Sequence, residues 1–175
     1  NGVLIGSQAS QGEEIRGVAV DPDGNYYLTG RVWDPDRLGL GVLNDLYLAK
    51  YSSTGALLWH RAMGSSGPEG RQRANGGQRV AVDAAGDIYV AGSSSGRADF
   101  GDVTFPATPG GPLLCKFKPD GTLFWVKRVE GRAQVFEGVP VGNGASQSMV
   151  LDREGSVVMA GYLINGPADF GGTTV

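Results

Sequence analysis

The feature that most constrains the fold of this chain is a segment that occurs three times. It reads GVAVDPDGNYYLTG, RVAVDAAGDIYVAG and SMVLDREGSVVMAG, at 17–30, 79–92 and 148–161. The copies start at 17, 79 and 148 and are thus 62 and 69 residues apart. Each has an apolar stretch, an aspartate, a glycine three positions later, a second apolar stretch and a final glycine. Repeats at such spacing predict an array of similar structural units.

Two further segments recur in the same order. LYLAKYSSTGALLWHRAMG at 46–64 matches LLCKFKPDGTLFWVKRVEG at 113–131, and ADFGDVTF at 98–105 returns as ADFGGTTV at 168–175. The first residues of the chain, NGVLIGSQ, match the end of the longer segment. In the first full unit, four short segments are rich in Val, Leu, Tyr and Trp, and lie at about 15–20, 25–32, 45–51 and 56–62.

The turns between these segments contain D-P-D-G, S-T-G, D-A-A-G, K-P-D-G and D-R-E-G, and no segment has a long helical period. Four antiparallel strands in a unit of about 60 residues predict a blade of a β-propeller. We therefore expect an all-β chain that forms an incomplete propeller, with two full blades and parts of two others. The expected boundaries are 1–14 for the last strand and crossover of a preceding blade, 15–64, 79–131, and 147–175 for half of a further blade.

These motifs resemble the bacterial SBBP-type β-propeller repeat. The resemblance covers nearly the whole chain and rests on VAVDPDGNYYLTG, VAVDAAGDIYVAG, ADFG and the two Lys–Trp segments. It implies a propeller fold and a place in a secreted or cell-surface bacterial protein. Because propellers usually close with at least four blades, we expect the missing blades to come from a longer chain or from further copies.

Charge and composition exclude several partners. The formal net charge is −3, and no block of like charge indicates a nucleic-acid surface or a polybasic membrane segment. No apolar stretch approaches the ~18 residues of a membrane span. The one cysteine, Cys115, permits no internal disulfide.

Strand alternation divides the loops between two faces of the predicted propeller. One face carries the short, uniform turns, and the other carries the longer loops at 33–45, 65–79 and 131–147. Function on a rigid scaffold is concentrated on variable loops. We therefore predict ligand contacts on the variable face, and the candidate residues are Trp33, Asp36, Arg37, Arg71, Arg73 and Arg79, together with Asp34 and Gln78.

The run Asp21-Pro22-Asp23-Gly24-Asn25 has the spacing of a calcium loop, but Val32 replaces the required glutamate and the repeats replace Asp23 by Ala85 and Glu154. A tight turn explains the retained Asp and Gly better. We expect no metal and no cofactor.

Catalysis is also not expected. His60 lies on an outer strand without triad partners, and Cys115 aligns with Ala49 as a small core residue. Trp59 and Trp125 are expected to pack between blades. For Lys50 and Lys116 we expect either a pair with an acid of the neighbouring blade or a path to the surface.

The leading hypothesis is a non-enzymatic scaffold that mediates protein–protein interaction or assembly. Its partner would be another protein, the remaining blades of the same chain, or copies of itself. One alternative is a carbohydrate-binding module that uses Trp33, Phe136 or Tyr162. The other is a piece of a larger propeller enzyme whose active site lies in the missing blades.

Overall fold

The computed structural model describes residues 13–32, 45–64, 76–129, 134–136, 139–141 and 144–163. Across these ranges the chain consists of β-strands and turns, with no helix. The strands make two four-stranded and two two-stranded sheets, every strand pair is antiparallel, and none of these sheets closes on itself. The predicted all-β class is confirmed.

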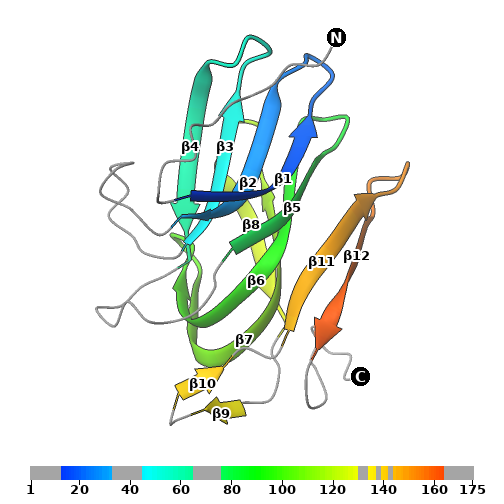
Figure 1. Cartoon of the computed structure of the whole chain (residues 1–175). Helices are drawn as coiled ribbons and strands as arrows, with labels where there is room; N and C mark the ends of the chain where they lie inside the picture. Colours follow the sequence, from blue (N-terminus) through cyan, green and yellow to red (C-terminus); the bar gives the residue numbers. More distant parts are fainter. Residues whose placement is uncertain are drawn as a thin grey trace.

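The first sheet has its strands in chain order, β1-β2-β3-β4 (Figure 1). They are β1 (Glu13–Val20), β2 (Tyr26–Val32), β3 (Asp45–Tyr51) and β4 (Leu57–Met63). Each begins and ends within two residues of a segment predicted from the repeats. The prediction works because runs of branched and aromatic residues, bounded by Gly, Asp and Ser, favour strands and turns through local chemistry.

The second sheet repeats this order as β5-β6-β7-β8. It contains β5 (Gly76–Val82), β6 (Ile88–Asp99), β7 (Thr104–Phe117) and β8 (Leu123–Arg128). β6 and β7 are longer than their counterparts and form an extended hairpin whose turn holds the D-F-G segment. There Phe100 is buried, and the Gly101 amide donates to Asp99 Oδ1 at 2.9 Å. The D-F-G at 99–101 is therefore a strand-end turn with a buried phenylalanine, and its second copy, at 169–171, lies outside the described residues.

The third repeat contributes β11 (Gly144–Leu151) and β12 (Val157–Leu163), which pair with each other. They are preceded in the chain by a short strand pair, β9 (Gln134–Phe136) and β10 (Val139–Val141). The first strands of the three repeats are neighbours, since β5 lies against β1 and β11 lies against β5. The β1–β2, β3–β4 and β11–β12 turns lie at one end of the molecule, and the β6–β7 hairpin lies at the other (Figure 1).

The first turn of each repeat is built around its aspartate. The Oδ1 atoms of Asp21, Asp83 and Asp152 each accept the backbone N–H groups two and four residues later, at 2.7–3.1 Å. Gly24, three positions after Asp21, has a φ of 81°. Side-chain bonding to the local backbone and a left-handed glycine together define a tight turn. The tight-turn interpretation of this segment is confirmed.

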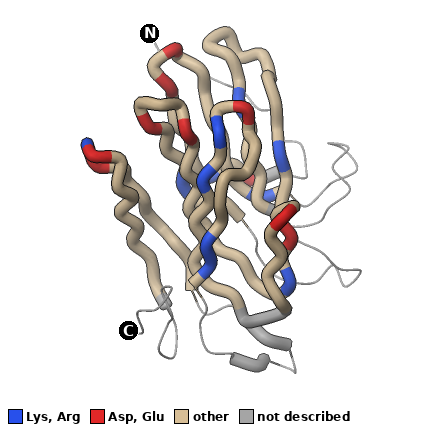
Figure 2. The backbone as a smooth tube through the Cα atoms, turned by 180° about the vertical axis from the view of Figure 1, so that it is seen from behind, with Lys and Arg blue, Asp and Glu red and all other residues tan. Residues whose placement is uncertain are grey.

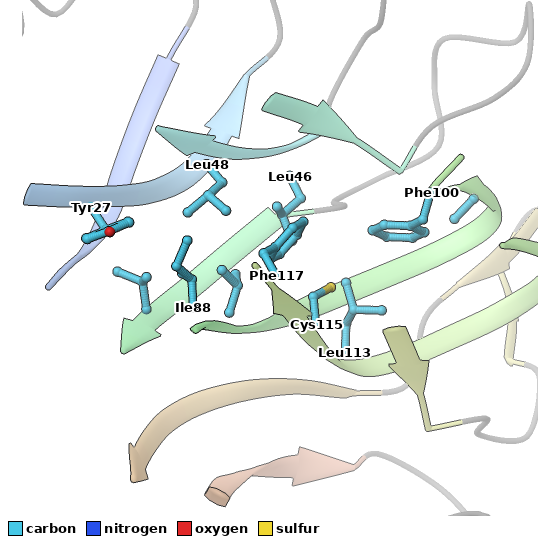
Figure 3. Packing of buried hydrophobic residues seen from close by; sticks show 11 residues of the cluster. Tyr27, Leu46, Leu48, Ile88, Phe100, Leu113, Cys115 and Phe117 are labelled. Atoms are coloured by element: carbon cyan, nitrogen blue, oxygen red, sulfur yellow. The ribbon is translucent and has the colours of Figure 1, made fainter. Parts of the chain in front are cut away.

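The largest core lies between the first and second sheets. Leu46 and Leu48 of β3 face Ile88 and Phe117 of the second sheet, and all four side chains are fully buried (Figure 3). Trp59 packs against the edge of this cluster. A second core, with Tyr89, Met149 and Trp125, joins the second sheet to the β11–β12 pair. Both tryptophans therefore pack between the sheets of successive repeats, as predicted.

Positions are called equivalent below when they lie at the same offset from the repeated aspartate or tryptophan. By this rule Gly77 is equivalent to Ser146, and Thr29 is equivalent to Ala91. The Thr29 hydroxyl donates to the Tyr47 carbonyl at 2.8 Å and lies against Gly77, where an added Cβ would overlap it. At the next junction Ser146 supplies the hydroxyl and donates to the Gly92 carbonyl at 2.6 Å. Each junction thus has a buried Thr or Ser hydroxyl at this position, supplied from opposite sides.

Candidate functional site

The first sheet carries a polar cluster beside its first turn. It consists of Asp21, Asn25 and Tyr27 from the turn and from β2, and Lys50 from β3. Asp21 Oδ2 accepts Asn25 Nδ2 at 2.9 Å and the Tyr27 hydroxyl at 3.1 Å, and it lies 3.6 Å from Lys50 Nζ. The ammonium also lies 5.0 Å from the centre of the Tyr27 ring. Tyr27 in turn meets Trp59 edge to face, so the cluster closes one end of the core.

The second sheet has the same cluster with a different ion pair. The Tyr89 hydroxyl donates to Asp83 Oδ2 at 3.2 Å, and Lys116 Nζ lies 4.9 Å from the centre of the Tyr89 ring. Lys116 pairs with Asp87 at 2.7 Å, and Asp87 is equivalent to Asn25. Both lysines therefore bind an acid of their own sheet. Of the two expectations for these lysines, the pair with an acid of the neighbouring repeat was wrong, because the first turn of their own sheet already places a carboxylate beside each lysine.

These contacts shift the proton affinities of the first cluster. Burial alone would raise the pKa of Asp21, but the hydrogen bonds from Asn25 and Tyr27 and the Lys50 charge outweigh it, so the pKa is lowered. Burial would lower the pKa of Lys50, yet its hydrogen bond with Tyr27 and the charge of Asp21 raise it. Burial raises the pKa of Tyr27. The charged Asp21–Lys50 pair and the neutral phenol are thus the forms that the fold stabilises.

In the second cluster, the hydrogen bond with Asp87 raises the pKa of Lys116, and the hydrogen bond with Tyr89 adds a smaller effect in the same direction. The third repeat keeps Asp152, but Val158 occupies the tyrosine position and Ser156 the position of Asn25. The cluster is therefore a property of the two four-stranded sheets and not of the turn alone. Its acids accept hydrogen bonds from their own turns and sheets, which is a structural use of these carboxylates.

Within the described residues, no group of three or more His, Cys, Asp or Glu side chains is placed to hold a metal ion. Figure 2 shows that acidic positions gather at hairpin turns. The backbone hydrogen bonds place Asp21, Asp83 and Asp152 in such turns. Asp120 belongs to this set: the Thr122 amide donates to its Oδ1 at 2.8 Å, and that hydrogen bond lowers the pKa of Asp120. At these turns the acidic side chains serve as acceptors for their own backbone.

Of the predicted ligand contacts, Arg79 lies within the described residues. It is exposed on β5, and its guanidinium donates to the Arg16 carbonyl at 3.3 Å and the Gln78 carbonyl at 2.7 Å. Arg79 thus connects β5 to β1 across the junction of the first two sheets. The candidates outside the described residues are Trp33, Asp34, Asp36, Arg37, Arg71 and Arg73. Gln78, beside Arg79, is half-buried.

The other candidates for chemistry have packing roles. Cys115 is fully buried in the core between the two large sheets, as predicted, and burial raises the pKa of its thiol. His60 is half-buried on β4, and its ring meets Tyr47 edge to face at 6.3 Å. His60 is therefore partly covered by its own sheet.

The sequence repeats do not predict the buried charge of Arg128. Arg128, at the end of β8, donates to the Gly96 carbonyl at 2.9 Å and the Pro106 carbonyl at 3.2 Å, and it stacks over Phe105 at 4.4 Å. It holds the extended β6–β7 hairpin to the edge of the sheet. The available signal was its position: Arg128 lies three residues after Trp125, where the first repeat has Ala62.

Apolar side chains are exposed on the two outermost sheet faces. Val18 and Val20 of β1 and Leu57 of β4 form what we call the β1 face. Val150 of β11 and Val158 and Tyr162 of β12 form what we call the β12 face; Val150 and Val158 are paired across the two strands. Besides Tyr162, the carbohydrate hypothesis names one more aromatic residue within the described ranges, Phe136, which lies on β9.

No protein-family model and no curated protein matches the chain. In the part of the chain that the structure describes, no helix has the length and apolar character to cross a membrane.

Proposed function

We propose that the repeats are blades of a β-propeller and that the chain is a non-enzymatic scaffold for protein–protein interaction or assembly. The observation that carries this proposal is the pair of apolar outer faces on a stack of regularly packed sheets. Exposed apolar patches rimmed by polar residues are typical of protein interaction sites. From the resemblance to SBBP-type repeats, we place the protein outside the cell or on the bacterial cell surface.

The arrangement of the first strands supports the propeller. Blades radiate from their first strands, which lie side by side around a common axis. β1 and β5 come into close backbone contact, since a Cβ added at Gly17 would lie 3.1 Å from Arg79 Cα. β11 continues the same series beside β5. The outer strands β4 and β8 carry the tryptophans that pack between successive sheets.

The use of polar groups supports a scaffold over an enzyme. Asp21, Asp83 and Asp152 accept turn amides, while Lys50 and Lys116 are paired within their sheets. A catalytic group needs a free lone pair or proton at a site that substrate can reach. These side chains instead form hydrogen bonds that recur from repeat to repeat, as expected of a framework.

The test is capture of a protein partner by the purified chain. The immobilised chain is exposed to secreted and cell-surface proteins of its source organism, and each retained protein is purified and titrated against it. We expect specific binding with a dissociation constant in about the micromolar range or tighter. A triple variant, Arg71→Ala, Arg73→Ala and Arg79→Ala, asks whether the variable-loop arginines contribute, and unchanged affinity would remove them from the site.

A parallel glycan array separates the main alternative. Binding to a saccharide, combined with the failure of every protein to bind, would replace the scaffold proposal by the carbohydrate-binding one. Turnover of a substrate by the purified chain would overturn it in favour of an enzyme.

A further inference from the structure

The exposure of the β1 face is a consequence of its position in the series of sheets. Val18 is 62% exposed, whereas its equivalents Val80 and Met149 are each 8% exposed. Val20 and Leu57 are also exposed, whereas their equivalents Val82 and Leu123 pack against the core between the first and second sheets. In each case the side chain is covered wherever a preceding sheet lies against that face.

The β12 face shows the same relation in the opposite direction. Val158 is 56% exposed, whereas its equivalents Tyr27 and Tyr89 are 1% and 5% exposed. Tyr27 and Tyr89 are covered because a following sheet packs against them. The other side of β11–β12 already packs on the second sheet through Met149 and its neighbours.

Each junction within the chain therefore joins two different kinds of face. Tyr27 and Trp59 of the first sheet meet Val80 and Leu123 of the second, and Tyr89 of the second meets Met149 of the third. The β12 face corresponds to the sheet face that carries Tyr27 or Tyr89, since Val158 is equivalent to them. The β1 face corresponds to the sheet face that carries Val80 or Met149, since Val18 is equivalent to them. The β12 face and the β1 face are therefore related in the same way as the two faces that meet at an internal junction. Neither internal junction joins two faces of the same kind.

We propose that a second copy of this chain binds head to tail, with the β12 face of one copy on the β1 face of the next. This rests on the proposed assembly function and specifies its partner. A dimer whose two-fold axis passes through the contact itself would place a face against its own kind, whereas the internal junctions always join unlike faces. The contact is therefore heterologous, and its repetition gives a ring if the rotation between copies closes and an open series of sheets if it does not.

The heterologous geometry makes a sharp test. Val18→Asp places a charge on the β1 face alone, and Val158→Asp places one on the β12 face alone. Each variant by itself loses one side of every contact, so we expect association to weaken by at least about a hundredfold. In a mixture, the intact β12 face of the Val18→Asp chain meets the intact β1 face of the Val158→Asp chain. The mixture should form a heterodimer that grows no further.

The measurement is sedimentation velocity with multi-angle light scattering on the full 175-residue chain over about a hundredfold range of concentration. Phe124→Asp is the matched control, because Phe124 is 60% exposed although its strand, β8, belongs to the second sheet, which packs on the first sheet and on the β11–β12 pair. We expect this control to associate like the unmodified chain. Far-UV circular dichroism and urea midpoints establish that each variant is folded, and Val18→Lys and Val158→Lys replace any acidic variant that is not.

Three outcomes would overturn the proposal: an unmodified chain that stays monomeric throughout, a Val18→Asp chain that still self-associates, or a mixture that forms no heterodimer although the unmodified chain assembles. A monomer that nevertheless binds another protein would refute self-association and leave the scaffold function standing. A monomer that binds no protein would refute both.

Discussion

The buried hydroxyl at each sheet junction leads to a prediction about a swap. At the first junction Thr29 supplies the hydroxyl opposite Gly77, and at the second Ser146 supplies it opposite Ala91. The double change Thr29→Ala and Gly77→Ser would give the first junction the chemistry of the second. We expect the two substitutions to compensate for each other.

The size of the effect follows from the contacts. A Cβ at position 77 would overlap the Thr29 hydroxyl and lie 3.0 Å from Thr29 Cβ, and Thr29 is β-branched and buried. Overpacking of this kind costs about 1–3 kcal/mol, so Gly77→Ser alone should destabilise by that amount. Because Gly77 lacks a left-handed φ, the cost comes from packing and not from the backbone. Thr29→Ala alone removes a buried hydrogen bond, at about 1 kcal/mol.

In the double variant the alanine makes room for the serine, whose hydroxyl can reach the Gly30 carbonyl, equivalent to the Gly92 carbonyl that Ser146 uses. We expect the double variant to be more stable than the sum of the single effects by about 1–3 kcal/mol. The assay is urea unfolding of the four proteins at one low concentration, with slopes compared to confirm a common transition.

The control pair is Thr29→Ala with Phe124→Ser, whose sites lie in different sheets, on β2 and β8, and should give additive changes within about 0.5 kcal/mol. Additive changes for Thr29 and Gly77 would refute the reasoning, because they would mean that the two side chains do not compete for one space.

Three further predictions concern charge, reactivity and packing. The lowered pKa of Asp21 stabilises the fold above about pH 4, the usual carboxyl range, and this stability is lost as the pH falls through the lowered value. The raised pKa values of Lys50 and Tyr27 stabilise the fold below about pH 10, and that stability is lost as the pH rises further. The urea midpoint of unfolding should therefore fall both below about pH 4 and above about pH 10. A midpoint that does not change with pH would contradict the proposed role of the cluster. Cys115 should react with a thiol reagent at least about a hundredfold more slowly in the folded protein than in urea, and equal rates would contradict its burial. Phe117→Ala should cost about 3–5 kcal/mol. Phe124→Ala at the exposed site loses the contact of its ring with the Lys116 ammonium, 5.6 Å away, and should cost about 1 kcal/mol or less. Similar losses for the two variants would contradict the assigned core.

The strands and turns were predictable because their causes are local. Asp21 and Gly24 specify a turn through bonds to the adjacent backbone and a left-handed φ, so the same spacing gives the same turn in every repeat. The burial of Cys115 and the place of Trp59 between sheets also followed from the repeat, since equivalent positions have similar neighbours. The predicted loop contacts rest on residues that mostly lie outside the described ranges, and Arg79 has a bridging role that repeats alone do not reveal.

The sequence by itself therefore determined the all-β class, the four strands of the repeat and the chemistry of its first turn. Only the tertiary structure decided that Lys50 binds Asp21 whereas Lys116 binds Asp87, and that the junction hydroxyl comes from Thr29 at one interface and Ser146 at the next. It also decided which side of each sheet meets its neighbour and which apolar side chains stay exposed. These features depend on distances between strands far apart in the chain, and a pattern of residue types along one strand does not contain those distances.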